Sequence, residues 1–477
     1  MNPRLSFIPA RWAALLVNGV LAGVLAACGV GQDGTGAAPD TQATGVVTGF
    51  GSVIVDGVHF DVSRADITAD GVSSRSQDEL RVGMVVTVTG TLAVDGASGS
   101  ATKVIYESLL RGTIDAAPGT NALRVLGQRI AVDSTTLFDG VDSIADLLQG
   151  DPLQVSGFTD PSGGFRATWI RKESSAPQPQ LTGFISAVNG NVVQLAGLSV
   201  DISGATWVGV TPGNLAAGQR VRVVLQAPPI GGAAVATRLV LIDAGLAGAL
   251  RRQALQGLVH QWNSATQTFE LDRQTVRINA TTQFQEGSLA DIGNGARVGV
   301  LGSRAGDGVL TAERVLIYRP AIDGYVRGRV TAIDRVAQRF SVQVAPGIQV
   351  QIQARTVLSD LSLANGLTLD NLALGNEVLA LGWLSGNRID AGLVQRLPLL
   401  TPGVGIGGPV TGFNAANGTL TILGVSVTSA NAQFFDAQGQ VQSSAQFFAA
   451  LSANDVVRAD GGLLASTLLA TAVRRVP

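Results

Sequence analysis

Residues 80–90 read LRVGMVVTVTG: a leucine, two spacers, a glycine, and then apolar residues at alternate positions. The phrase closes with Ala-x-x-Val, here from Ala101 to Val104, and it returns five more times along the chain. The position after the two spacers is occupied in turn by Gly83, Gly150, Gly218, Gly295, Gly375 and Asn454. Spacings of 67, 68, 77, 80 and 79 residues between these positions predict an array of similar small modules.

The start of each module predicts a bent strand followed by a hairpin. A glycine is followed two residues later by Val or Ile and, in most copies, five residues later by a bulkier apolar residue, as in Gly45, Val47 and Phe50. Strict alternation would place positions two and five on opposite faces of a strand, so we expect a bulge or a turn between them. The second hairpin arm alternates apolar and polar residues, as Phe60 and Val62 do, which is typical of a half-buried strand.

The rest of the module predicts three more elements. A stretch that suits one or two helical turns, clearest at 142–149 and 442–453, precedes the repeated leucine. The glycine that follows suits a turn with positive φ into a fourth strand, and Ala-x-x-Val forms the fifth. Five strands with a helical turn between the third and the fourth is the plan of an OB-like barrel. The sequence therefore predicts an all-β chain of six tandem, small, five-stranded OB-like barrels.

A six-bladed β-propeller is the alternative architecture, because each of its blades is likewise a small repeated β-module, built of four strands. The loose, proline-containing linkers at 174–180 and 398–407 disfavour it. We expect the barrels at 45–109, 110–175, 181–243, 257–320, 327–397 and 408–477, with the last copy degraded. The Ala- and Gly-rich connector 244–256 is predicted to pack as a helix between the third and fourth barrels.

The first residues predict a secreted, lipid-anchored protein. Two arginines precede an apolar stretch at 12–27, which is short for a spanning helix but suits a signal peptide over 1–27. The stretch ends in Leu25-Ala26-Ala27-Cys28, which resembles the lipobox of bacterial lipoproteins and implies acylation of Cys28. In that family Gly29 implies transport to the outer membrane of a Gram-negative bacterium. Small polar residues over 28–44 predict a flexible tether, so the glycines at 29–34 are no dinucleotide motif.

The composition disfavours nucleic-acid binding and excludes sites built on several cysteines. The chain has 60 glycines, 33 basic and 35 acidic residues, and only two of the basic residues are lysines. A near-neutral chain without a basic stripe is not expected to bind nucleic acid. Cys28 is the single cysteine, so disulfides within the chain and thiolate metal sites are excluded. We expect neither a cofactor nor a metal.

No catalytic constellation is predicted. By the strand pattern His59 and His260, the two histidines, point to solvent. The candidates for paired-carboxylate or calcium chemistry are Asp56, Asp61, Asp66 and Asp70 in the first module. Their spacing fits no calcium loop, and Asp56-Gly57 is typical of a hairpin turn, so turn and surface roles are the preferred interpretation. Four aromatics at equivalent places are interpreted as core residues: Phe138, Trp207, Phe284 and Phe434.

The phrase GFGSVIVDGVHF at 49–60, together with residues 80–90 and the lipobox, resembles an uncharacterised family of tandem OB-like domains in secreted bacterial lipoproteins. The resemblance transfers no functional residue apart from Cys28. We therefore expect a non-enzymatic envelope lipoprotein, periplasmic or surface-exposed, whose barrels bind a protein or glycan partner or serve a structural role. The alternatives are a carboxylate-dependent hydrolase of envelope polysaccharide and a single-stranded nucleic-acid-binding protein.

Overall fold

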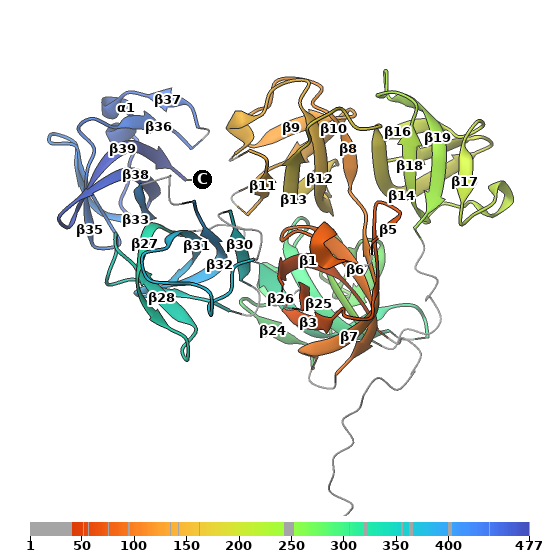
Figure 1. Cartoon of the computed structure of the whole chain (residues 1–477), viewed down its shortest axis with the longest axis horizontal. Coiled ribbons are helices and arrows are strands. Elements are labelled where there is room, and N and C mark those ends of the chain that lie inside the picture. Colours follow the sequence, from red (N-terminus) through yellow and green to blue (C-terminus); the bar gives the residue numbers. More distant parts are fainter. Residues whose placement is uncertain are drawn as a thin grey trace, which may run out of the picture. The chain divides into compact units, whose positions relative to one another are not determined.

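The computed structural model describes residues 41–477, apart from 51, 56, 75, 94–95, 134, 142, 162, 243–251, 305, 319–322, 354–355, 362–365, 399–402, 438 and 477. The expected signal peptide, Cys28 and most of the tether lie outside the described residues. Within the described residues, strands dominate and form six barrels in chain order (Figure 1). No helix among them is long and apolar enough to cross a membrane.

The elements of the six barrels follow in chain order. Barrel 1 contains β1 (Thr41–Gly49), β2 (Val53–Val55), β3 (Val58–Asp61), β4 (Asp66–Ala69), β5 (Val72–Ser74), η1 (Gln77–Glu79), β6 (Val85–Leu92) and β7 (Ser98–Tyr106). Barrel 2 contains β8 (Leu110–Thr113), β9 (Ala122–Val125), β10 (Gln128–Ala131), β11 (Leu137–Asp139), η2 (Ile144–Asp146), β12 (Pro152–Thr159) and β13 (Phe165–Lys172). Barrel 3 contains β14 (Gln180–Asn189), β15 (Val192–Leu195), β16 (Leu198–Asp201), β17 (Thr206–Val208), η3 (Pro212–Asn214), β18 (Arg220–Leu225) and β19 (Ala233–Leu241).

The second half of the chain repeats the plan. Barrel 4 contains β20 (Arg252–Leu258), β21 (His260–Asn263), β22 (Thr268–Leu271), β23 (Gln274–Arg277), β24 (Gln283–Gln285), η4 (Leu289–Asp291), β25 (Arg297–Arg304) and β26 (Leu310–Tyr318). Barrel 5 contains β27 (Gly324–Asp334), β28 (Arg339–Val342), β29 (Gln349–Gln351), β30 (Val357–Asp360), β31 (Glu377–Ser385) and β32 (Arg388–Arg396). Barrel 6 contains β33 (Val404–Asn414), β34 (Thr419–Ile422), β35 (Val425–Thr428), β36 (Gln433–Phe435), β37 (Val441–Gln442), α1 (Ser444–Ala449), β38 (Val456–Leu464) and β39 (Thr467–Arg475).

Five strands close each barrel. In barrel 1, β1 pairs with β2, β2 with β3, β3 with β7 in parallel, β7 with β6, and β6 with β1. The equivalent strands complete the same cycle in the other barrels. A sheet that closes on itself leaves no open edge in its cycle. This closure within each module confirms the predicted tandem barrels and excludes the propeller, whose blades are open sheets.

The bulge predicted in the first strand is confirmed in five barrels. In barrel 1 the pairing register shifts between Val47 and Gly49, and equivalent shifts occur in barrels 3 to 6.

The predicted helical stretch is shorter than expected in barrel 2, where η2 covers three residues. In barrel 6 it is the helix α1, which starts with a capping box between Ser443 and Gln446.

The residue at the repeated glycine position makes the same backbone hydrogen bonds in every barrel. Gly83 has φ +95°, its N–H donates to the Val47 carbonyl at 2.9 Å, and the Val47 N–H donates to the Met84 carbonyl at 2.8 Å. All six positions have positive φ, including Asn454 at +71°, and all make the equivalent pair of bonds. The two repeated positions, the glycine and the Val or Ile near the start of the module, are therefore hydrogen-bonded to each other. The predicted positive φ is confirmed.

The predicted core aromatics lie on a short extra strand. This strand, represented by β4, β11, β17, β24, β30 and β36, pairs in parallel with the last strand of its barrel. Phe434 is buried, whereas Phe138, Trp207 and Phe284 are partly buried and pack against their barrel cores. In barrel 6 the α1 residue Phe447 packs on Phe434, with ring centroids 4.9 Å apart. These contacts confirm a packing role.

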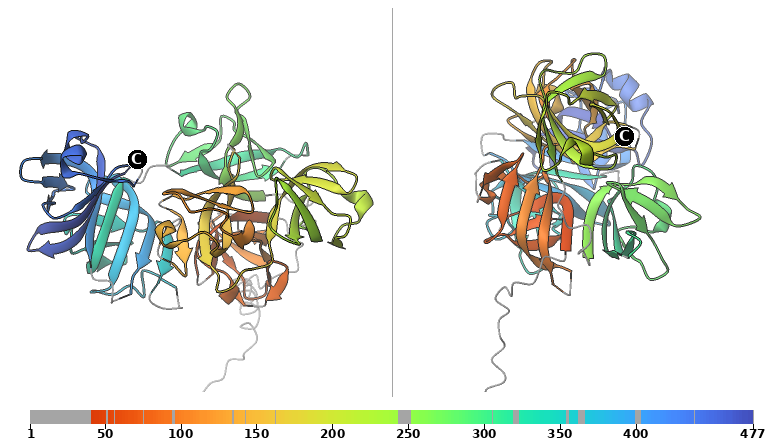
Figure 2. Two further views of the ribbon diagram at one scale, coloured as in Figure 1. Left: turned by 90° about the horizontal axis from the view of Figure 1, so that it is seen from above. Right: turned by 90° about the vertical axis from the view of Figure 1, so that its right-hand side faces the viewer.

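First strands join the barrels in pairs. β8 pairs with β14, which joins barrels 2 and 3, and β27 pairs with β33, which joins barrels 5 and 6 (Figure 2). Both junctions are antiparallel, and one hydrophobic core runs through each pair. Barrels 1 and 4 are joined differently, because β1 and β20 pair in parallel over Thr41–Thr44 and Arg252–Leu255.

Two expected non-strand segments are strand in part. β1 begins at Thr41, so residues 41–44 belong to a sheet and not to the tether that we expected over 28–44. β20 begins at Arg252, so residues 252–256 are strand and not the helix expected over 244–256. In both segments the partner is another first strand, distant in sequence, that offers backbone hydrogen bonds. Residues 243–251 lie outside the described part of the chain.

Candidate functional site

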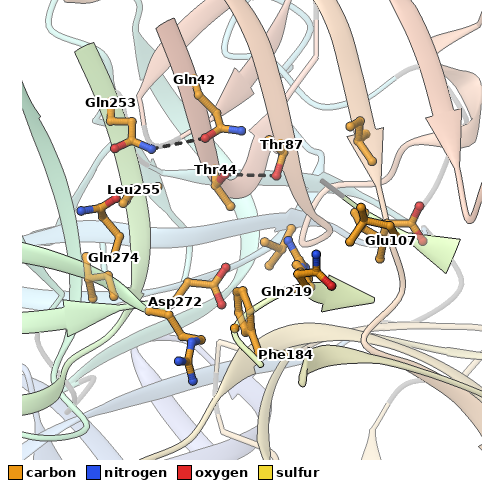
Figure 3. Close-up of a pocket in the computed structure, with 18 of the residues that line it drawn as sticks. Gln42, Thr44, Thr87, Glu107, Phe184, Gln219, Gln253, Leu255, Asp272 and Gln274 are labelled. Carbon is orange, nitrogen blue, oxygen red and sulfur yellow. Dashed lines mark hydrogen bonds between the residues drawn. The ribbon is translucent and has the colours of Figure 1, made fainter. Parts of the chain in front are cut away.

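A cleft of about 380 Å³ opens where barrels 1, 3 and 4 meet (Figure 3). We call it the inter-barrel cleft. Its lining side chains come from β1, β6, β20 and the β22–β23 hairpin of barrels 1 and 4, and from barrel 3. The residues used below are Gln42, Thr44, Thr87, Glu107, Phe184, Gln219, Gln253, Asp272, Arg273 and Gln274. Its volume lies in the range of small-molecule sites, roughly 300–1,000 Å³.

The floor of the cleft is the outer face of the sheet that joins barrels 1 and 4. Alternation along β1 buries Ala43 in the core and leaves Gln42 and Thr44 on the other face. The parallel register places Gln42 opposite Gln253, and the Gln253 Nε2 donates to the Gln42 Oε1 at 3.3 Å. The hydroxyls of Thr44 and Thr87 lie 3.1 Å apart across the antiparallel pair of β1 and β6. Amides and hydroxyls therefore form the floor.

One floor atom has no partner among the described residues. The Gln253 side chain is almost completely buried, with 5% of the residue exposed, and its Oε1 makes no hydrogen bond. Buried acceptors in folded proteins are paired with few exceptions. This acceptor is therefore an uncommon feature of the cleft.

The opposite wall combines an aromatic ring with polar turns. Phe184 on β14 is half-buried, and Figure 3 shows it across the cleft from Thr44. The Arg273 guanidinium lies 5.9 Å from the centroid of this ring. Asp272 and Arg273 both have positive φ, at +47° and +65°, as a tight two-residue hairpin requires. Gln219 accepts from the Ala216 N–H and donates to the Asn214 carbonyl, so its amide shapes the turn before β18.

Glu107 lies at one end of the cleft with a raised pKa. Its Oε2 accepts from the Arg222 Nη1 at 2.5 Å, and both side chains are more than nine-tenths buried. Burial raises the pKa of Glu107 to about 7, although Arg222 and Arg220 act in the opposite direction. This carboxyl group therefore titrates near neutral pH.

A polar network beside Glu107 joins barrels 1, 2 and 3. The Asp70 carboxylate accepts from the Ser108 N–H at 2.7 Å and from the Ser108 hydroxyl at 2.8 Å. It also accepts from the Gln154 Nε2 of barrel 2 at 3.0 Å and the Gln180 Nε2 of barrel 3 at 3.1 Å. Every donor is a neutral amide or hydroxyl group. The network therefore holds three barrels together and leaves no free carboxylate for chemistry.

The structure describes three of the four carboxylates considered in the sequence, and it separates them. Asp56 lies outside the described residues. Asp61 is exposed and caps its own turn through the Ser63 N–H at 2.9 Å, and Asp66 is exposed at the start of β4. Of the three that are described, Asp70 alone is partly buried, in the network above. No group of three or more His, Cys, Asp or Glu side chains that suits a metal ion occurs among the described residues.

The two histidines differ from each other. His59 is exposed, as expected, and its Nδ1 lies 3.2 Å from the Ser52 hydroxyl. His260 is half-buried, contrary to the expectation that it points to solvent. Its Nε2 lies 3.1 Å from the Thr159 carbonyl oxygen of barrel 2. The difference arises because barrel 2 packs against β21, a contact between modules that the strand pattern does not reveal.

Sequence reasoning missed the cleft. Gln42 and Thr44 fall in the range expected as a tether, and Gln253 falls in the range expected as a helical connector. The alternation of polar and small residues over 41–45 was a weak signal of a strand. No local signal indicates that β1 and β20 pair across more than 200 residues.

The comparisons with known proteins place the modules in a family. A family model with the description "Domain of unknown function (DUF5666)" matches residues 111–171, 256–315, 327–392 and 407–474. These ranges correspond to barrels 2, 4, 5 and 6 and cover just over half of the chain. No curated protein matches the chain. The chain therefore belongs to the DUF5666 family, as a tandem array of its domains.

Proposed function

We propose that this protein is a non-enzymatic binding or structural protein of the cell envelope, with a protein or glycan partner. The observation that carries the proposal is the inter-barrel cleft, whose lining combines amides, hydroxyls and one aromatic ring with acidic and basic side chains in similar number. Such a lining recognises a ligand by hydrogen bonding and surface contact. Three barrels contribute to the cleft, so their association is required for the function.

We propose further that acyl chains on Cys28 hold the protein at the outer membrane. The lipobox-like Leu25-Ala26-Ala27-Cys28 supports this localisation. Several acyl chains on one residue anchor far more firmly than one, since each buried CH₂ contributes about 0.8 kcal/mol. Twelve residues, 29–40, separate the anchor from β1.

A carboxylate-dependent hydrolase is the second candidate, and one observation favours it. Glu107 lines the cleft with a pKa of about 7, which is a suitable value for a general acid. Asp272 is a second carboxylate of the same cleft. This candidate requires that Glu107 exchanges its bond to Arg222 for one to a substrate.

Binding and hydrolysis are distinguished with one preparation of the full-length protein in a detergent without a sugar headgroup. A glycan array and affinity capture from envelope extracts test binding, and chromatography of envelope polysaccharide incubated with the protein tests hydrolysis. We expect a retained glycan or protein partner and unchanged polysaccharide. Release of soluble fragments by the wild type and none by Glu107→Gln would replace the binding proposal with the hydrolase.

A further inference from the structure

We propose that the inter-barrel cleft binds a short, neutral oligosaccharide. This inference rests on the proposed binding function and narrows its ligand to one chemical class and one site. It is carried by the hydrogen-bonding groups on the cleft floor, the aromatic ring across from them, and the balance of charge.

The floor offers donors and acceptors in the pattern that vicinal hydroxyl groups need. Gln42 uses its Oε1 to accept from Gln253, and its Nε2 has no partner among the described residues. The Oε1 of Gln253 is buried and has no partner among the residues that the structure describes. Between Thr44 and Thr87 one hydroxyl donates to the other, so the second keeps its own proton for another acceptor. A sugar hydroxyl both donates and accepts, so one ring satisfies amide and hydroxyl groups of both kinds.

Gln274, at the start of β23 in barrel 4, adds a further amide to the hydrogen-bonding groups of the cleft. Its Nε2 donates to the carbonyls of Thr275 and Gly308 at 2.9 and 2.8 Å, which fixes the direction of the amide. Its Oε1 has no partner within the described part of the chain. A fixed acceptor is already oriented for a ligand, and binding then costs little side-chain entropy.

Phe184 supplies an apolar surface opposite these polar groups. A pyranose ring has a C–H face that packs on an aromatic face, while its hydroxyl edge faces polar side chains. Figure 3 shows Phe184 on one side of the cleft and Gln42, Thr44 and Gln253 on the other. An aromatic ring on one side of the cleft, with amide and hydroxyl groups on the other, matches the two kinds of surface of a sugar ring.

The charges of the cleft disfavour a charged ligand. The acidic side chains are Glu107 and Asp272, and Glu107 is paired with Arg222. The basic side chains of the lining are Arg220, Arg273 and Arg304. Arg220 lies near enough to Glu107 to favour its charged form, and the Arg273 guanidinium lies over the Phe184 ring. Opposite charges in similar number leave no single-sign field to attract a polyanion or polycation. The volume of about 380 Å³ suits a short oligosaccharide and not a protein domain.

The test measures binding of neutral trisaccharides to the full-length protein in a detergent without a sugar headgroup. The probes are trimers of β-1,4-linked glucose, β-1,4-linked N-acetylglucosamine and α-1,4-linked glucose, with a trimer of galacturonate as the anionic comparison. Saturation-transfer NMR detects binding, and titration calorimetry measures the dissociation constant. The cleft variants are Phe184→Ala, Gln42→Ala and Gln274→Ala.

Two matched substitutions control for general effects. Phe413→Ala removes an exposed aromatic residue of barrel 6, and Gln433→Ala removes an exposed strand amide there. We expect a neutral trisaccharide to bind, with affinity reduced at least about fivefold by each cleft variant, the range for loss of one hydrogen bond or ring contact. The control variants should bind as the wild type does. Gln274 is the first residue of β23 and is only partly buried, so its variant remains informative if Phe184→Ala fails to fold.

The other outcomes separate the inference from the proposed function. If a neutral trisaccharide binds and the cleft variants do not weaken it, the cleft is not the site, although glycan binding stands. If no trisaccharide binds and affinity capture retains a protein partner, the oligosaccharide inference fails and the binding function survives. Preference for galacturonate over every neutral probe would contradict the charge argument.

Discussion

Substitution of the repeated glycine is the sharpest test of how each barrel is built. Gly83 and Gly375 occupy equivalent positions, with φ of +95° and +83°, and their N–H groups make equivalent bonds to Val47 and Val330. Their surroundings differ. A Cβ on Gly375 would meet nothing within 4 Å, whereas one on Gly83 would lie 3.1 Å from the Thr168 carbonyl and the Trp169 Cβ of barrel 2.

The two positions therefore separate backbone strain from contact between barrels. Gly375→Ala introduces strain alone and should cost about 1–2 kcal/mol of unfolding free energy. Gly375→Asn should cost less, because Asn tolerates positive φ and Asn454 occupies the equivalent position of barrel 6. At Gly83 every side chain also crowds barrel 2, so Gly83→Asn and Gly83→Ala should each cost about 1–3 kcal/mol more than at Gly375.

Native-state hydrogen exchange with mass spectrometry measures these effects barrel by barrel. We expect Gly375→Ala to raise exchange in peptides from 324–397, with a smaller effect for Gly375→Asn. Gly83→Asn should raise exchange in barrel 1 and also in β13 of barrel 2, because Thr168 and Trp169 lie in that strand. Equal effects of Asn at the two positions, confined to their own barrels, would refute the contact argument.

Three further predictions concern other residues. Glu107 has a pKa of about 7 in the folded protein against 4.5 as its ordinary value, so its contribution to stability is full below about pH 4.5 and lost as pH rises through 7. At about 1.4 kcal/mol per pH unit the loss is about 3–4 kcal/mol, and Glu107→Gln should flatten this part of the curve of denaturant midpoint against pH. Gly157→Ala should cost about 2–4 kcal/mol, since its Cβ would lie 2.1 Å from the Arg166 carbonyl oxygen. Gly412→Ala should be nearly neutral in thermal unfolding, because its Cβ would make an ordinary contact of 4.0 Å with the Thr421 hydroxyl. Mass spectrometry should find acyl chains on Cys28, and recovery of Cys28→Ala in the membrane fraction would contradict the proposed anchor.

Short-range features of the chain were predictable because each depends on one or two residue types. A half-buried strand must alternate, and a turn with positive φ favours Gly or Asn, so Gly83 and its equivalents marked the same turn six times. The bulge after Val47 followed from a break in that alternation. Repetition strengthened each of these signals, since six copies of one module must obey the same local rules.

The associations between barrels were decided by tertiary structure. Three contacts join residues that are distant in sequence: the parallel pairing of β1 with β20, the contact of His260 with Thr159, and the hydrogen bonds of Asp70 with Gln154 and Gln180. The candidate cleft depends on the same contacts, because Gln42, Phe184 and Gln253 come from three barrels. Local sequence determines which residues face outward from a barrel. Which barrel surfaces meet depends on the complementarity of the whole surfaces of two barrels, and no short pattern in the chain encodes that complementarity.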